Sequence, residues 1–250
     1  MKPEYVFGFL DEYLGHDGFP DYSGAENGLQ VEGAGRVTRI GAAVDASERV
    51  LGRAAAEGVD LLLVHHGLFW DPRRPLTGRR YRKAQILIES GMAVYSSHLP
   101  LDAHPEVGNC AVLMRALGWG ATERFGEWKG VEIGWRTSTA EPRDRLAERL
   151  GEVVGGPVQI LDGGPDRVEK VGLVTGGGGS FIAQAAEAGL DTLITGEGAH
   201  HTYVDAMELG VNVLYAGHYA TETWGVRALA EVLSERFGLP WHFLDDPSSL

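Results

Sequence analysis

The sequence predicts an α/β protein built from two similar α/β/α halves that arose by internal duplication. Three observations support this fold. Apolar segments of strand length alternate with helical patterns of about ten residues. One stretch of the chain recurs later without gaps, since Val37 matches Val168 and Leu62 matches Leu193 at one constant offset. Polar residues, histidines above all, gather where predicted strands end.

The first half is predicted over residues 1–125, and its sheet begins with the apolar stretch at Val37. A polar turn at residues 45–47 leads into a helical pattern over residues 50–56, which a glycine ends. The apolar run 61–64 is the next strand. Each of these features has a counterpart in the second half, so we expect a repeated β-α-β unit.

Residues 91–95 are predicted as a helix stop followed by a strand, and a helical pattern then runs through residues 112–113. The segment 69–81 contains two prolines and is predicted as an extra loop of the first half. We expect the two halves to join near residues 118–129. Strands separated by helices of this length favour a largely parallel sheet with right-handed crossovers.

The second half is predicted over residues 126–250, with a helix over 141–154. Its repeat begins at Val168, passes through a glycine turn at 176–180, and continues as a helix over 181–188. A further two strands and a helix follow, at residues 190–193, 211–214 and 226–233.

Composition limits the functional classes. Hydrophobic residues make up 44% and charged residues 23%, as in ordinary globular proteins. No apolar run approaches the roughly 20 residues that span a bilayer, and no signal peptide begins the chain. Cys110 is the single cysteine, which fits a cytoplasmic protein without intrachain disulfides. The net charge of -13 argues against a nucleic-acid binder.

The pair His65-His66 ends an apolar run and is followed at once by Gly67. At a strand end two imidazoles can turn toward one site, and imidazole is the commonest protein ligand for zinc-like metals. Ligands of parallel sheets bind beyond the carboxyl ends of the strands, so we expect a metal site in the cleft between the halves. The alternative is that the pair caps the strand through backbone hydrogen bonds.

Two further elements share one spacing. His98 lies four residues before Asp102, and His218 lies four before Glu222. A mixed set of histidines and carboxylates suits zinc, iron, manganese or nickel. If two divalent ions bind, Glu222 or Asp102 is the candidate bridge, and the shared water becomes a hydroxide nucleophile near neutral pH.

The glycine turn that ends in Ser180 has two interpretations. Its backbone N–H groups, at the start of a helix, would form a cradle for a phosphate group of the substrate. No lysine or arginine follows in the phosphate-loop pattern. The other interpretation is a tight turn whose following helix is capped by Ser180.

Four motifs resemble those of the GTP cyclohydrolase 1 type 2 homologue family, also called the Nif-three-like family, in its short bacterial form. They are Leu63-Val64-His65-His66-Gly67-Leu68-Phe69, Glu26-Asn27-Gly28-Leu29-Gln30-Val31, Ser97-His98-Leu99-Pro100-Leu101-Asp102, and a C-terminal block of Thr195-Gly196-Glu197, His200-His201 and Gly217-His218-Tyr219-Ala220-Thr221-Glu222. Two departures affect loop shape and substrate fit: Gly67 replaces the family's usual proline, and Leu99-Pro100 its usual Thr-apolar pair.

The resemblance implies two divalent metal ions per chain. By motif, His65 and His218 would bind one ion, His66 and Asp102 the other, and Glu222 would bridge both. The family also forms ring-shaped homohexamers with the sites facing an inner cavity, which implies a homo-oligomer here.

Other residues are assigned roles next to the metals. His98 matches a position beside the metals in the family, which implies orientation of a ligand or proton transfer, against a structural hydrogen bond. Glu197 is a candidate general base. His200 and His201 are predicted either to line the cavity and contact an anionic substrate or to form a polar helix start.

Two functions follow. The first is a metal-dependent hydrolase whose small-molecule substrate resembles a nucleotide; by family name, the reaction would open the imidazole ring of GTP. The alternative is a non-catalytic protein of metal homeostasis, or a metal-stabilised interaction scaffold. Neither a membrane nor a nucleic acid is the expected partner.

Overall fold

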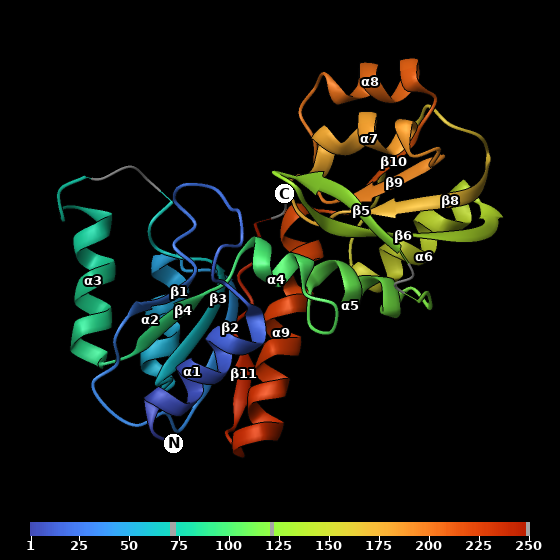
Figure 1. The fold of residues 1–250 in the computed structure, drawn as a ribbon. Helices are drawn as coiled ribbons and strands as arrows, with labels where there is room; N and C mark the ends of the chain where they lie inside the picture. Colours follow the sequence, from blue (N-terminus) through green and yellow to red (C-terminus); the bar gives the residue numbers. More distant parts are fainter. Residues whose placement is uncertain (71–73, 121–122, 249–250) are drawn as a thin grey trace. The chain divides into compact units, whose positions relative to one another are not determined.

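The computed structural model describes residues 1–70, 74–120 and 123–248 (Figure 1). The chain divides into two compact units. Unit 1 consists of residues 1–101 and 225–246, and unit 2 of residues 102–224 with the end of the chain from Pro247. These bounds differ from the predicted halves, which meet at residues 125 and 126. The difference has two causes. The C-terminal segment pairs with the sheet of unit 1, and residues 110–117 pack in the hydrophobic core of unit 2.

The sheet of unit 1 has five strands, in the order β1 (Gly28–Val31), β4 (Ala93–Ser96), β3 (Leu61–His66), β2 (Ile40–Asp45) and β11 (Trp241–Phe243). The pairs β4–β3, β3–β2 and β2–β11 are parallel, and β1 is antiparallel to β4. The predicted parallel pairing therefore holds for the inner strands, and an antiparallel strand lies at one edge.

Helices cover the sheet of unit 1 on both faces (Figure 1). They are α1 (Pro3–Leu14), α2 (Glu48–Ala56), α3 (Arg79–Ser90) and the C-terminal part of α9 (His218–Phe237), which begins in unit 2. The short helix α4 (Leu99–Ala103) follows β4, and its last residues belong to unit 2. Val50 and Leu51 of α2 and Leu87 of α3 pack on Leu62, Val64 and Val94 of the strands. The Ser47 side chain accepts a hydrogen bond from the backbone N–H of Val50 and caps α2.

The sheet of unit 2 has six strands, in the order β5 (Glu123–Trp128), β6 (Val131–Pro142), β8 (Arg167–Leu173), β9 (Thr192–Thr195), β10 (Asn212–Tyr215) and β7 (Gln159–Asp162). The three strands β8, β9 and β10 are parallel, whereas β5, β6 and β7 join them antiparallel. This sheet is therefore mixed, and the prediction of parallel pairing applies to its central strands.

Two helices, α5 (Asn109–Ala116) and α6 (Arg143–Val154), cover one face of this sheet through Leu113, Met114, Leu146 and Leu150. The other face carries the short helix η1 (Gly178–Phe181), α7 (Ile182–Glu187) and α8 (Thr202–Leu209) (Figure 1). Each unit thus has the predicted α/β/α layering. None of the helices within the described residues is long and apolar enough to cross a membrane.

The duplication is visible in the strand register. Ile40 pairs with Leu61 in unit 1, and Val171 pairs with Thr192 in unit 2, so both partners are shifted along the chain by the same offset. A side-chain contact repeats as well. Asp60 accepts hydrogen bonds from the backbone N–H groups of residues 38 and 39, and Asp191 accepts them from residues 169 and 170. The gapless sequence match therefore corresponds to one repeated local structure.

Several element bounds differ from the predictions. β2 begins at Ile40, three residues after the predicted start. The predicted helix over 141–154 begins at Arg143, because the two residues before it pair with β8. The predicted join near residues 118–129 contains β5. Residues 121–122 of this segment lie outside the described chain. The predicted helix over 226–233 is the centre of α9, which starts at His218.

Candidate metal centre

His65 and His66 are the last two residues of β3, as the sequence predicts. Nδ1 of His65 lies 3.0 Å from the carbonyl oxygen of Ser97, and Nδ1 of His66 lies 2.9 Å from Oδ1 of Asp45. Asp45 ends β2 directly opposite His66 in the parallel ladder. The two rings lie side by side, with centroids 4.8 Å apart. The end of β3 therefore holds a pair of oriented imidazoles.

A third histidine joins them in unit 1. His98 follows β4, and its Nδ1 lies 2.8 Å from Oδ1 of Asp21. One nitrogen of each of the three rings lies within 4.8 Å of the others, which is close enough to share an ion. His98 thus lies beside the predicted ligands, as the family resemblance implies.

Asp21 is the residue that fixes His98. Its side chain also accepts hydrogen bonds from the amide of Asn27 (2.9 Å) and the backbone N–H of Leu99 (3.1 Å). Burial raises the pKa of Asp21, but the hydrogen bond and charge of His98, together with the hydrogen bonds from Asn27 and Tyr22, outweigh burial and hold this pKa below its ordinary value. The carboxylate is therefore an anchored acceptor for the ring.

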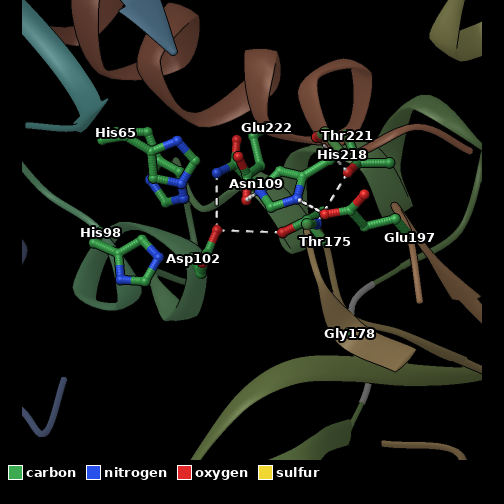
Figure 2. A network of polar contacts seen from close by, with 12 residues as sticks. His65, His98, Asp102, Asn109, Thr175, Gly178, Glu197, His218, Thr221 and Glu222 are labelled. Carbon is green, nitrogen blue, oxygen red and sulfur yellow. Dashed lines mark hydrogen bonds and ion pairs between the residues drawn. The ribbon is translucent and has the colours of Figure 1, made fainter. Parts of the chain in front are cut away.

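In unit 2, Asp102 is buried and held by two donors (Figure 2). The Asn109 amide nitrogen lies 2.8 Å from Oδ1 of Asp102, and the Thr175 hydroxyl donates to the same oxygen at 3.2 Å. Asn109 begins α5 and Thr175 follows β8. Because both donors bond one oxygen, they set the orientation of the carboxylate.

The second element of unit 2 is the pair His218 and Glu222, one turn apart on α9. Nε2 of His218 lies 3.1 Å from Oε1 of Glu222, and Nδ1 lies 2.7 Å from Oε1 of Glu197 (Figure 2). Burial lowers the pKa of His218, but the two carboxylates, Glu222 first, outweigh burial and raise it to about 9. His218 and Glu222 therefore share a proton between Nε2 and Oε1 when no metal is bound.

A glycine makes room for this pair. At Gly176, with φ of 66°, a Cβ atom would collide with Oε1 of Glu222 and would lie 3.4 Å from Nε2 of His218. The hydroxyl of Thr221 accepts a hydrogen bond from the backbone N–H of Gly176 at 3.0 Å. The glycine at the start of the turn therefore leaves the space that the side chains of Glu222 and His218 occupy.

The rest of the turn is tight, as one of the two interpretations predicts. The N–H of Gly178 donates to the Thr195 hydroxyl (2.9 Å), and the N–H of Gly179 to the carbonyl of Glu197 (3.2 Å). A phosphate cradle would need these two N–H groups, and both already donate to protein oxygens. The predicted helix cap by Ser180 is wrong: Ser180 lies inside η1, and the N-cap residue of α7 is Phe181. Substrate binding by the exposed Ser180 stays a prediction.

His200 and His201 are exposed and lie in the turn before α8. His201 is the N-cap residue of that helix, but its side chain forms no capping hydrogen bond there. His200 lines a cavity of about 750 Å³ together with Glu197. Contact of either histidine with a substrate stays a prediction, while both also form the polar start of a helix.

The four imidazoles share one feature that suits metal binding. In each, Nδ1 faces an oxygen acceptor: Ser97 O for His65, Asp45 for His66, Asp21 for His98 and Glu197 for His218. In a neutral ring of His65, His66 or His98, Nδ1 then carries the hydrogen and Nε2 the lone pair, a tautomer assigned from these bonds. Nε2 of His218 also faces a carboxylate, Glu222, so a metal ion would replace the proton that this pair shares. Protein ligands of metals are commonly held by such outer acceptors, so the residues present fit a divalent ion.

The sequence did not predict most of these outer partners. Asp21, Ser97, Asn109 and Thr175 hold candidate ligands but are far from most of them in sequence. Asp45 is the exception. It occupies the turn equivalent to the glycine turn of the second half, which predicts that it orients a ligand histidine, and it does so for His66. Glu197, predicted as a general base, is the acceptor that orients His218.

The fold and these residues define an α/β protein of two repeated sheets whose strand ends carry oriented histidines and carboxylates. The chain belongs to the family described as Duf34/NIF3 (NGG1p interacting factor 3), which matches residues 1–248. The family predicted from the four motifs is therefore confirmed.

Known proteins are similar over the full chain. The GTP cyclohydrolase 1 type 2 homolog of Deinococcus radiodurans is 44% identical over 97% of this chain and 92% of its own length. The homolog of Escherichia coli K12 is 39% identical over 99% of both chains. The crystal structure of TTHA1606 from Thermus thermophilus is 43% identical, covers both chains completely and gives a TM-score of 0.90. Reduced HcgD from Methanocaldococcus jannaschii is 28% identical over 98% of both chains, with a TM-score of 0.86.

Proposed function

We propose that this protein binds two divalent metal ions and acts as a metal-dependent hydrolase on a nucleotide-like small molecule. The candidate ligands are the five that the motifs predict: His65, His66, Asp102, His218 and Glu222. The observation that carries the proposal is the fixed orientation of the imidazoles, each with Nδ1 on an oxygen acceptor. The homologs named for GTP cyclohydrolase 1 type 2 support the hydrolase class.

The side chains have distinct roles in this proposal. Divalent ions, when bound, supply an acidified water and stabilise the charge that develops during hydrolysis. Glu197 orients His218, and Asp45 orients His66, so that Nε2 of each ring is presented to an ion. His98 is held by Asp21, and an imidazole in this position could carry a proton to or from a reacting group.

One observation favours the alternative, a non-catalytic protein of metal homeostasis. Glu197, the candidate general base, has one carboxylate oxygen bonded to Nδ1 of His218 at 2.7 Å. A base committed to orienting a ligand is a poorer proton acceptor for catalysis. Metal binding is common to both functions, so turnover is the measurement that separates them.

Metal content tests the binding step. Purified protein loaded with zinc or manganese and dialysed should hold about two ions per chain by elemental mass spectrometry. Glu222→Gln should lose at least one ion, and Asp102→Asn should lower the content as well. Glu235→Gln, an exposed carboxylate on the same helix, is the matched control and should retain both. Equal metal content in all four proteins would refute the assignment.

Turnover tests the hydrolase. Metal-loaded protein incubated with GTP should release formate, and Glu222→Gln should abolish the release. Formate that persists in Glu222→Gln would indicate a contaminating activity. Full metal content without turnover on any of a panel of nucleotides would favour metal homeostasis.

The family resemblance also implies a homohexamer, which we retain as a proposal. Light scattering of the metal-loaded protein should give a mass about six times the 27.0 kDa of one chain. A monomer at micromolar concentration would contradict it.

A further inference from the structure

Unit 2 contains a cavity of about 750 Å³ next to Glu197. This volume falls in the range of roughly 300–1,000 Å³ that small-molecule sites occupy. Two kinds of side chain line the cavity. Val158 and Leu161, from the segment around β7, are apolar, whereas Glu197, His200 and Tyr215 are polar. The mixture suits an organic molecule with an apolar part and a few polar groups.

The direction of one hydrogen-bond chain sets the polarity of the cavity. The Thr202 hydroxyl donates its single hydrogen to the carbonyl of Ala199 at 2.5 Å. Tyr215 must therefore donate its own hydrogen to Thr202, whose oxygen lies 2.5 Å away. Burial raises the pKa of Tyr215, so the phenol stays protonated. The phenolic oxygen can then accept a further hydrogen bond from a molecule in the cavity.

A glycine permits this arrangement. A Cβ atom at residue 198 would collide with the hydroxyl of Tyr215 and would lie 2.9 Å from that of Thr202. Gly198 lies between Glu197 and the turn before α8, so the backbone approaches the two hydroxyl groups closely. The hydroxyl pair is therefore a packed part of the wall, held in one geometry.

The charges of the lining residues limit which molecules the cavity can bind. Among the described residues that line the cavity, Glu197 is the sole carboxylate, and neither a lysine nor an arginine contributes. The Glu197 side chain is 47% exposed, so its carboxylate is accessible to a bound molecule. A phosphate group would meet this carboxylate and would find no lysine or arginine in the lining to bind it. A neutral group that carries N–H donors would meet two acceptors, the carboxylate and the phenolic oxygen.

We propose that this cavity binds the neutral, N–H-bearing ring of an N-heterocyclic substrate and leaves any phosphate groups outside. This inference deepens the proposed function and rests on it in one respect, that the bound molecule is the substrate. Glu197 connects the two, because the carboxylate that accepts from the ring also holds Nδ1 of His218. The ring would then bind next to Glu197, the carboxylate that orients the candidate metal ligand His218.

Calorimetry on the metal-free protein tests the cavity by itself. In excess chelator no metal can bind a phosphate group. The affinities of guanosine, GTP and inorganic tripolyphosphate, titrated separately, then depend on contacts with the protein alone. Because the phosphate groups contribute no contact in the cavity, we expect guanosine to bind at least as tightly as GTP, and tripolyphosphate not to bind. Tyr215→Phe should weaken guanosine binding about five-fold, the effect of one hydrogen bond. Tyr5→Phe, an exposed tyrosine of unit 1, is the control and should bind as the native protein does.

Several outcomes would overturn the inference: tighter binding of GTP or tripolyphosphate than of guanosine, no guanosine binding, or equal binding by Tyr215→Phe and the native protein. Metal content, measured on a second portion of each purified protein that is loaded with metal in the absence of chelator, separates this failure from that of the proposed function. Full metal content without guanosine binding refutes the cavity assignment alone. Guanosine binding in a protein that takes up no metal refutes the proposed function and leaves the cavity as a binding site.

Discussion

Oε1 of Glu197 lies 2.7 Å from Nδ1 of His218, and this hydrogen bond determines which nitrogen of the ring faces Glu222. Asp45 holds Nδ1 of His66 in the same manner in unit 1, at 2.9 Å. In both units a carboxylate from a neighbouring strand end therefore orients a histidine. Acidic residues that do not bind the ion themselves can set its affinity through this contact.

Replacement of Glu197 should weaken metal binding without removing a ligand. We expect Glu197→Ala to lower zinc affinity by about 10- to 100-fold, because Nδ1 of His218 loses its acceptor. Competition with a chromophoric chelator measures the affinity. Glu208→Ala, an exposed carboxylate on α8, should bind zinc as the native protein does. Identical affinities of the two variants would show that the contact does not position the ring.

Gly176 should be intolerant of any side chain, for two separable reasons. Its φ of 66° costs an L-residue about 1–2 kcal/mol, and a Cβ atom would also displace Glu222. Gly189 has almost the same φ, 67°, but no heavy atom within 4 Å of its Cβ position. In denaturant unfolding, Gly189→Ala should show the backbone cost alone, and Gly176→Ala should be less stable and also lose metal. Equal metal content in both variants would refute the crowding argument.

His16 should make the protein sensitive to mild acid. Burial holds the pKa of His16 below its ordinary value of 6.5, although Asp11, Asp17 and Asp21 act in the opposite direction. Below pH 6.5 the unfolded state therefore binds this proton more readily than the folded state. The free energy of unfolding should fall as the pH falls below 6.5 through the folded pKa.

His16→Gln should remove that contribution and make the pH dependence of unfolding shallower between pH 6.5 and 5. Denaturant titrations at several pH values measure the slope. His200→Gln, in which the replaced histidine is exposed, should keep the native slope. A steeper slope in His16→Gln would mean that the neighbouring carboxylates outweigh burial.

Cys110 should be inert in the folded protein. Burial, with the charge of Asp102, raises the pKa of the thiol from 9.0 to about 12. A shift of this size lowers the fraction of thiolate about a thousand-fold at neutral pH. Iodoacetamide at pH 8 should leave the native protein unmodified by mass spectrometry and add one group after denaturation. Rapid modification of the native protein would contradict the buried position.

Much of the repeat was predictable because a β-α-β unit leaves a local pattern. The apolar strands, the helix between them and the constant offset between the two copies all appear in the register of Ile40 with Leu61 and of Val171 with Thr192. The return of β11 to β2 was not predictable. Trp241–Phe243 is a short, partly buried strand whose partner lies in the first fifth of the chain, and no local signal specifies such a pairing.

The candidate ligands were easier to predict than the residues that hold them. His65, His66 and His218 stand at strand ends or at a helix start, where spacing and motif identify them. Asp21 and Thr175 act through hydrogen bonds that form only on folding, to His98 and Asp102. Aspartate and threonine are common in turns, so their presence in the sequence carries no information about these contacts.

The position of β11 has a consequence for synthesis on the ribosome. Residues 102–224 form unit 2 without any segment from later in the chain, apart from its last residues, so unit 2 can fold while the polypeptide is still growing. The sheet of unit 1 must wait, because its edge strand β11 emerges only after residues 102–224 have been synthesised. Until then β2 presents an unpaired edge, and the nascent chain depends on quick completion or on a chaperone to shield it.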